Sequence, residues 1–294
     1  MTLPPATDPG PRDAAPAAGP ATPTRPGTAR RPDPWNPPGW LLIGLGAAFV
    51  TALAAAIFLP GATLIDRLRV LDSGICAQLP THTLFPAGIE LPLCSRNTGI
   101  YTGFSATFLV LLSSRRLRAM YLPGFAVSLI LGAAVLILAV DGFNSLFLDL
   151  GLPHFYQPHN LVRLATGLGT GTAMAAFLLP ITSGMLWRQD DDRSSFATPR
   201  QLAIMLPVLL LAFLVIASQA AWTLYPIAIL SSAGLITALT LINLVFALGL
   251  TGRHNRYTHP RQVIPLAALA VALALVELYA LAALHSALLY GLHP

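Results

Sequence analysis

Long apolar runs alternate with short polar segments over most of the chain. The first run extends from Trp40 to Pro60, which matches the roughly twenty residues that a helix needs to cross a bilayer. Comparable runs follow it at intervals down the chain. The pattern predicts an all-α fold, a polytopic transmembrane helix bundle of about seven helices. These helices are expected near residues 40–60, 97–113, 121–140, 161–187, 202–221, 224–250 and 263–292.

Two segments interrupt this pattern. Residues 1–38 are crowded with Pro, Ala, Thr and Arg and contain no large apolar cluster. Such a segment cannot bury enough surface to offset the entropy lost on ordering, so we predict a disordered Pro/Ala-rich tail. Residues 61–96 are predicted to be a long loop between the first two helices. Residues 39–294 then form the transmembrane helical domain.

Composition narrows the class of protein. Hydrophobic residues make up 55% of the chain and charged residues only 10%, whereas soluble domains carry roughly a quarter charged residues. A water-soluble fold could not cover its surface with so few charges, so we predict an integral membrane protein. Lysine is absent and all 17 basic residues are arginine. This excludes a retinal pigment, because retinal is held by a lysine Schiff base.

The arginines are placed at helix ends and predict an orientation. Clusters precede the first predicted helix and follow the second, fourth and sixth, so they alternate correctly to lie on one side of the membrane. The positive-inside rule makes that side cytoplasmic. The N-terminus is then cytoplasmic, and the C-terminus and the loop 61–96 are extracytoplasmic. In a membrane protein such clusters indicate orientation rather than nucleic-acid binding.

The predicted outer loop contains both cysteines of the chain, Cys76 and Cys94. Disulfides persist on that side of a membrane, and closing a loop of this length would contribute about 3 kcal/mol in the chain-entropy model. We therefore predict a disulfide. The alternative is a metal site that adds His82, although the spacing matches no strong ligand motif.

Polar residues gather where the second, third and fourth predicted helices meet this loop. Arg163 and Thr166 share one face of the fourth helix by their i, i+3 spacing. A buried arginine is costly unless it is paired or hydrated, and Asp141 is its nearest evident partner in the sequence. Either the two form a structural ion pair, or Arg163 binds an anionic group such as a carboxylate or a lipid phosphate.

These blocks resemble one family. Cys76 with Gln78, then the stretch from Pro92 to Gly103, then Asp141-Gly142, then Asn160 with Arg163 and Thr166 are similar to the uncharacterised prokaryotic multi-pass membrane family known as domain of unknown function 2085. The resemblance covers about residues 70–185. It implies a prokaryotic inner (cytoplasmic) membrane protein and no particular activity.

The resemblance also implies a set of ligands that this chain only partly has. The family pattern places Cys-His-Gln in the first block and Cys-x-x-Cys-Thr-Gly in the second, which would suggest a metal or redox site. Here Ala77 stands at the histidine position and Asn97 at the third cysteine position. We therefore predict no metal and no cofactor. The other matching residues suggest a polar outer pocket formed by Arg96, Thr98, Tyr101, Asp141, Arg163 and Thr166.

One further acid, Glu277, lies near the middle of the last predicted helix. Because an acid there is costly to insert, we expect it to face protein or water, either as a hydrogen-bonded packing residue or as a proton carrier.

The chain has none of the nucleotide-binding, zinc-protease or hydrolase motifs, so no enzyme activity is predicted. The favoured hypothesis is a protein that binds or transports a small anion or a lipid headgroup at the outer pocket. The alternatives are an accessory subunit of a larger membrane complex, or a membrane enzyme or redox protein acting on a lipid or thiol.

Overall fold

The computed structural model describes residues 60–291 apart from 189, 190 and 253. The predicted tail 1–38 and all but the last residue of the predicted helix 40–60 lie outside this range. Within it the protein is all-helical, as predicted, and its only extended pairings are two isolated bridges, Tyr121–Ser194 and Trp187–Tyr257. The α-helices are α2 (Leu64–Asp72), α3 (Ser95–Ser113), α4 (Phe125–Asp149), α5 (Asn160–Leu186), α6 (Pro199–Leu202), α7 (Met205–Ala217), α8 (Leu224–Thr251) and α9 (Pro260–Gly291).

Five described helical stretches are long and apolar enough to cross a membrane: Phe125–Asp149, Asn160–Leu186, Pro199–Ala217, Ala221–Thr251 and Pro260–Leu288. They coincide with five of the predicted helices, and the shorter α3 corresponds to a sixth. The membrane-helix prediction is therefore confirmed for the described residues.

Two predicted boundaries are wrong. The segment 61–96 is not loop throughout, because α2 begins at a capping box in which Thr63 and Asp66 bond each other's backbone N–H groups. The helix predicted to end at residue 140 continues to Asp149. Its added turns contain Asn144 and Ser145, which are buried and bonded to neighbouring segments. Tertiary partners for these polar residues explain why the helix does not stop where its apolar run ends.

Helices α3 and α5 cross at a glycine seam. A Cβ atom added to Gly99 would overlap the carbonyl oxygen of Leu164, and one added to Gly167 would overlap that of Arg96. Small residues let two membrane helices approach closely enough for backbone contact. The seam fixes the start of α3 against the first turns of α5, and so places Arg96 and Arg163 near each other.

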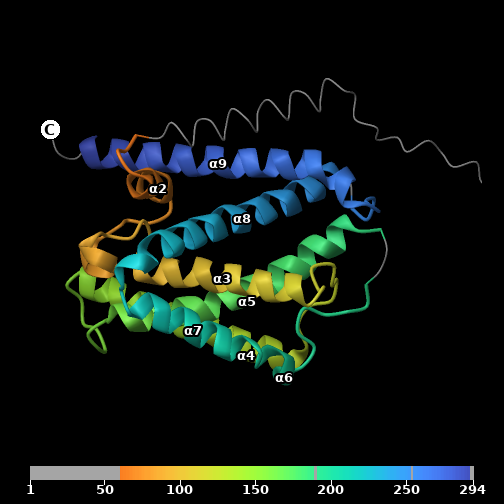
Figure 1. Cartoon of the computed structure of the whole chain (residues 1–294), viewed down its shortest axis with the longest axis horizontal. Helices are drawn as coiled ribbons and strands as arrows, with labels where there is room; N and C mark the ends of the chain where they lie inside the picture. The colour runs from red at the N-terminus through yellow and green to blue at the C-terminus, as the bar shows by residue number, and fades with distance from the viewer. Residues whose placement is uncertain (1–59, 189–190, 253, 292–294) are drawn as a thin grey trace, which may run out of the picture. The chain divides into compact units, whose positions relative to one another are not determined.

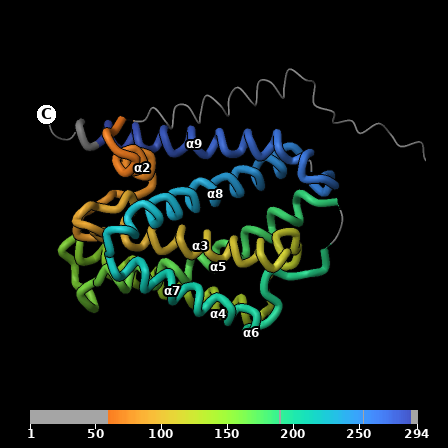
Figure 2. The backbone as a smooth tube through the Cα atoms, in the orientation of Figure 1, coloured from red at the N-terminus to blue at the C-terminus, as the bar shows by residue number. Residues whose placement is uncertain are grey.

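The helices form layers around this pair (Figure 1). Helix α3 packs on α5 and α8, α4 packs on α5, and α9 packs on α8. The tube view shows α8 between α9 and α3 (Figure 2). We call the end where α3 and α5 begin the cluster end, and the end where α3, α5 and α8 finish the arginine end. The loops of the arginine end contain Arg115, Arg116, Arg118, Arg188, Arg193, Arg256 and, with the start of α6 and α9, Arg200 and Arg261.

Candidate functional site

Asp141 is the centre of a buried polar network at the cluster end. Its side chain is 2% exposed, and its Oδ2 atom accepts a hydrogen bond from Arg96 Nη2 at 2.6 Å. The other oxygen, Oδ1, accepts from the Tyr156 hydroxyl, also at 2.6 Å. Both carboxylate oxygens of Asp141 therefore already accept a hydrogen bond. Asp141 thus pairs with Arg96, rather than with the Arg163 partner that the sequence suggested.

Arg163 is buried with only neutral hydrogen-bond partners. Its Nη1 donates to Asn160 Oδ1 at 2.8 Å, and its Nη2 lies 3.3 Å from Ser145 Oγ. Among the described residues no carboxylate lies within ion-pair distance of this guanidinium, although the residue is only 3% exposed. A guanidinium stays charged in a protein. The site therefore buries one positive charge that has no anion in direct contact.

Ser145 joins the two arginines. Its hydroxyl oxygen accepts from Arg163 and also from Arg96 Nη2, the latter at 3.1 Å. The Arg96 Nε atom is buried and has no hydrogen-bond partner among the described residues. Two guanidinium groups on neighbouring helices thus share one hydroxyl, and within the described residues only Arg96 of the two is bonded to a carboxylate. Such an arrangement favours the binding of an additional, negatively charged hydrogen-bond acceptor.

Two asparagines tie the surrounding loops to this network. Asn144 accepts from the backbone N–H of Phe155 at 2.7 Å and donates to the Tyr156 carbonyl at 2.8 Å. Asn160 donates to the carbonyls of Thr81 and Thr83. The loop between α4 and α5 and the loop before α3 are therefore held in fixed positions over the arginines.

A cavity of about 450 Å³ adjoins the network. Asn160 lines it, and the same side chain accepts the hydrogen bond from Arg163. The remaining wall is mixed, with Thr81, Thr83 and His159 beside the apolar side chains of Leu84, Phe85 and Leu161. The cavity is large enough for a small organic molecule. Asn160 alone links its polar wall to Arg163, which has no carboxylate partner among the described residues.

Two titratable groups beside the network have shifted pKa values. Partial burial and the hydrogen bond to Asp141 raise the pKa of the Tyr156 hydroxyl to about 12, so it remains a donor at neutral pH. Burial and the nearby Arg163 charge lower the pKa of His82, whose Nε2 lies 3.2 Å from Asp149 Oδ1. The surroundings of His82 therefore disfavour its charged form.

The other predicted pocket residues have different surroundings. The hydroxyl of Thr98 donates to the Leu93 carbonyl, and that of Thr166 donates to the Arg163 carbonyl. Tyr101 packs against apolar side chains of two core clusters. These three positions support the helix starts and the core, while Arg96, Asp141 and Arg163 come together as a group.

Glu277 is separate from this group. It lies on α9, is exposed, and accepts a hydrogen bond from Asn243 of α8 at 3.0 Å. The structure therefore gives it a partner on the adjacent helix and places it outside the polar network.

The cysteines do not form the predicted disulfide. Both are free, and the backbone N–H of Cys94 donates to Cys76 Sγ at 3.3 Å. Hydrogen bonds from the Cys94 side chain and backbone lower the pKa of the Cys76 thiol to about 6. The two free cysteines are therefore joined by hydrogen bonds, and the Cys76 thiol is the more acidic of the two. The alternative metal site is not assembled either, since within the described residues no three His, Cys, Asp or Glu side chains form a metal-binding group.

A second buried acid, Asp72, lies at the end of α2. It is fully buried, its Oδ2 accepts from Ser232 Oγ of α8 at 2.6 Å, and its Oδ1 has no partner within the described part of the chain. Burial and the nearby Cys76 raise its pKa to about 7, against the hydrogen bond from Ser232. This acid is thus half-protonated near neutral pH.

Sequence reasoning missed Asn144, Ser145 and Tyr156. Asn144 and Ser145 follow Asp141 at i+3 and i+4, which places all three on one helical face. That spacing was available in the sequence once the helix was allowed to continue past residue 140. Tyr156 lies in the loop before α5, and no local pattern distinguishes it from its neighbours.

The long apolar helices and the charged network that they shield define a polytopic α-helical membrane protein. A family model described as "Predicted membrane protein (DUF2085)" matches residues 76–177, a range that includes both arginines and Asp141. An uncharacterized protein of Methanothermobacter thermautotrophicus is 31% identical over 104 residues, which are 34% of this chain and 81% of that protein. An uncharacterized protein of Methanocaldococcus jannaschii is 29% identical over 122 residues, 42% of this chain and 72% of the relative.

The chain therefore belongs to the DUF2085 family of predicted membrane proteins. No solved structure matches it.

Proposed function

We propose that the cluster end binds a small organic anion, either a free carboxylate or phosphate or the anionic headgroup of a lipid. The observation that carries this proposal is the Arg163 guanidinium, which is buried and, among the residues that the structure describes, bonded only to Ser145 and Asn160. Burying an unpaired charge is costly, and an anion in the site would offset that cost.

The adjoining cavity supports the proposed class of ligand. Asn160 lies between Arg163 and the cavity, so a modest rotation of its amide would let an anionic group reach the guanidinium. The apolar wall of Leu84, Phe85 and Leu161 would then cover a short hydrocarbon portion. Because Asp141 is already saturated by Arg96 and Tyr156, it orients the network and is not free to neutralise Arg163.

Thermal unfolding of the purified full chain in detergent tests the proposal, with sodium butyrate and glycerol 3-phosphate as probes. A ligand at ten times its Kd stabilises the folded state by about 1.4 kcal/mol, so wild-type Tm should rise by a few degrees. Arg163→Gln should remove this rise. Arg200→Gln, an exposed arginine at the other end, is the matched control and should preserve it.

Two results would overturn the proposal. One is the absence of a Tm shift with either probe in the wild type, and the other is an equal shift in Arg163→Gln and wild type. If Arg163→Gln does not fold, Asn160→Ala takes its place, because it removes the amide that links Arg163 to the cavity. Stable co-purification with other subunits in place of any ligand response would favour an accessory role instead.

A further inference from the structure

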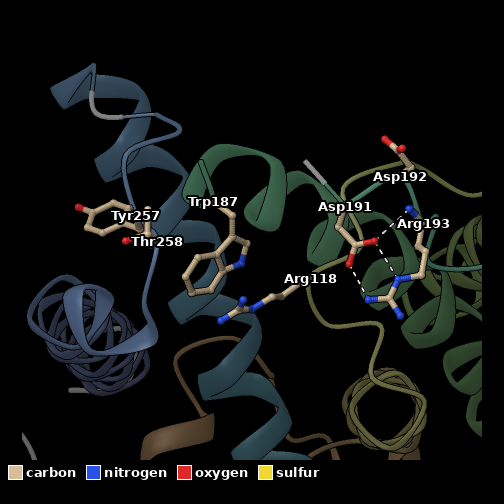
Figure 3. Close-up of a pocket in the computed structure, with 7 residues that line it drawn as sticks. All are labelled: Arg118, Trp187, Asp191, Asp192, Arg193, Tyr257 and Thr258. Carbon is tan, nitrogen blue, oxygen red and sulfur yellow. Dashed lines mark hydrogen bonds and ion pairs between the residues drawn. The ribbon is translucent and has the colours of Figure 1, made fainter. Parts of the chain in front are cut away.

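A different pocket lies at the arginine end (Figure 3). Its volume is about 320 Å³, and its walls come from the loop after α3, the end of α5 with the segment that follows, and the loop between α8 and α9. The lining residues are Arg118, Trp187, Asp191, Asp192, Arg193, Tyr257 and Thr258. None of them belongs to the polar network of the cluster end.

Main-chain hydrogen bonds hold the pocket walls together. The Arg188 N–H donates to the Tyr257 carbonyl at 2.9 Å, and the Tyr257 N–H donates to the Leu186 carbonyl at 3.1 Å. The loop between α8 and α9 is thereby fixed against the end of α5. A site whose walls are set before binding loses less entropy when a ligand enters.

Arg118 is the charge in this pocket that remains available. Its guanidinium lies over the Trp187 ring, 4.4 Å from the ring centroid, and no described acid lies within ion-pair distance of it. Asp191 differs, because its two carboxylate oxygens are bonded to Arg193 Nε and Nη2. Figure 3 shows the side chains of Asp191 and Arg193 bonded to each other, and the Asp192 side chain pointing away from Arg118.

We propose that this pocket binds the phosphate group of a phosphate ester through Arg118, with Trp187 holding the guanidinium in place. The planar guanidinium matches two phosphate oxygens at once, and stacking on an aromatic ring fixes its orientation. The N–H groups of Arg118, for which no hydrogen bond to a described residue is present, supply the donors.

The surroundings favour a phospholipid headgroup as the source of this phosphate. Tryptophan and tyrosine are enriched where membrane helices meet the headgroup layer, and Trp187 directly follows the apolar helix α5. Asp192 nearby disfavours a doubly charged phosphate and suits a diester, which has one negative charge. A soluble phosphate ester offers the same oxygens, and the experiment below separates the two sources.

Native mass spectrometry of the delipidated full chain in detergent tests the proposal, with dioleoyl phosphatidylglycerol and, separately, glycerol 3-phosphate as probes. Arg118→Gln should weaken binding by about tenfold or more, since a charge-assisted hydrogen bond contributes at least that factor. Arg118 is exposed, so the variant should fold. Arg200→Gln should bind as the wild type does. Because glycerol 3-phosphate is also a probe for the cluster end, the effect of Arg118→Gln is measured again in the Arg163→Gln background and should be the same there, which separates this test from that of the cluster end.

Binding of the lipid alone identifies a headgroup site, and binding of both probes identifies a general phosphate site. Either result supports the proposal if Arg118→Gln weakens the binding. Trp187→Ala provides a second test, because it removes the stacking surface, keeps the charge and should weaken binding of the same probe. Equal affinities of wild type, Arg118→Gln and Arg200→Gln would overturn the proposal, as would no binding of either probe to wild type.

Discussion

The two ends of the bundle use arginine in different ways. At the cluster end, Arg96 and Arg163 are turned into the protein and bonded to side chains on other helices. At the arginine end, Arg118 and Arg193 are exposed, and their contacts are an aromatic ring and an adjacent aspartate. Arg96 and Arg163 therefore support tertiary structure at one end, whereas Arg118 remains available to the surroundings at the other.

This difference follows from burial. A charge removed from water must be compensated by fixed partners, so each member of a buried network depends on the others. Charges in water need no such partners, and exposed ion pairs contribute little. We therefore expect substitutions at the cluster end to affect folding and binding together, and substitutions at the arginine end to affect binding alone.

Removing Asp141 should have the largest effect. Asp141→Ala leaves the Arg96 guanidinium buried without its carboxylate, and breaking a buried pair from one side costs about 3–5 kcal/mol. The free energy of unfolding, measured by denaturant titration in detergent, is expected to fall by that amount. Asp192→Ala, an exposed acid at the arginine end, should change it little. Equal effects of the two substitutions would remove the contrast between the ends.

Asp72 should make stability depend on pH. Its pKa is raised to about 7 by burial, so between its unfolded value near 4 and pH 7 the folded state binds more protons than the unfolded state. Stability should therefore fall as pH rises through that window, by up to about 4 kcal/mol at 1.4 kcal/mol per unit. The measurement is Tm from pH 4 to pH 8 for wild type and Asp72→Asn. The fall of Tm with rising pH should be smaller in Asp72→Asn. Parallel pH profiles of the two proteins would contradict the expectation.

The glycine seam predicts a contrast within one helix. Gly167→Ala near the cluster end would press a methyl group into the Arg96 carbonyl, whereas at Gly184, near the arginine end, the nearest atom to an added Cβ is 3.9 Å away. Overpacking costs about 1–3 kcal/mol, while alanine in place of an unconstrained helical glycine stabilises by up to about 1 kcal/mol. We therefore expect Gly167→Ala to lower Tm and Gly184→Ala to raise it. A stabilised Gly167→Ala would mean that α3 and α5 separate easily.

These features differ in how far the sequence revealed them. Apolar length alone predicted the described membrane helices, because crossing a bilayer imposes it on each helix separately. The grouping of Arg96, Asp141 and Arg163 was also visible as polar residues beside one loop. Their pairing was not, since it depends on how far α4 extends and on which face of each helix turns inward.

The cysteine prediction failed for a related reason. Cys76 and Cys94 are close in space, as their spacing suggested, but they are joined by hydrogen bonds and both remain free. The relative orientation of two side chains is set by the start of α3 and the turn after α2. Sequence separation contains no information on that geometry.

The Asp191–Arg193 pair should give the smallest effect. The two residues are separated by one position, and in their ion pair of 2.7 Å the Arg193 side chain is 54% exposed. Solvent screening and side-chain entropy cancel most of the attraction in such pairs, so Arg193→Gln should leave Tm unchanged within error in detergent and in 1 M salt. A clear loss of Tm in Arg193→Gln that high salt does not reproduce in the wild type would show that this pair is shielded from water. The arginine end would then have to be regarded as buried, like the cluster end.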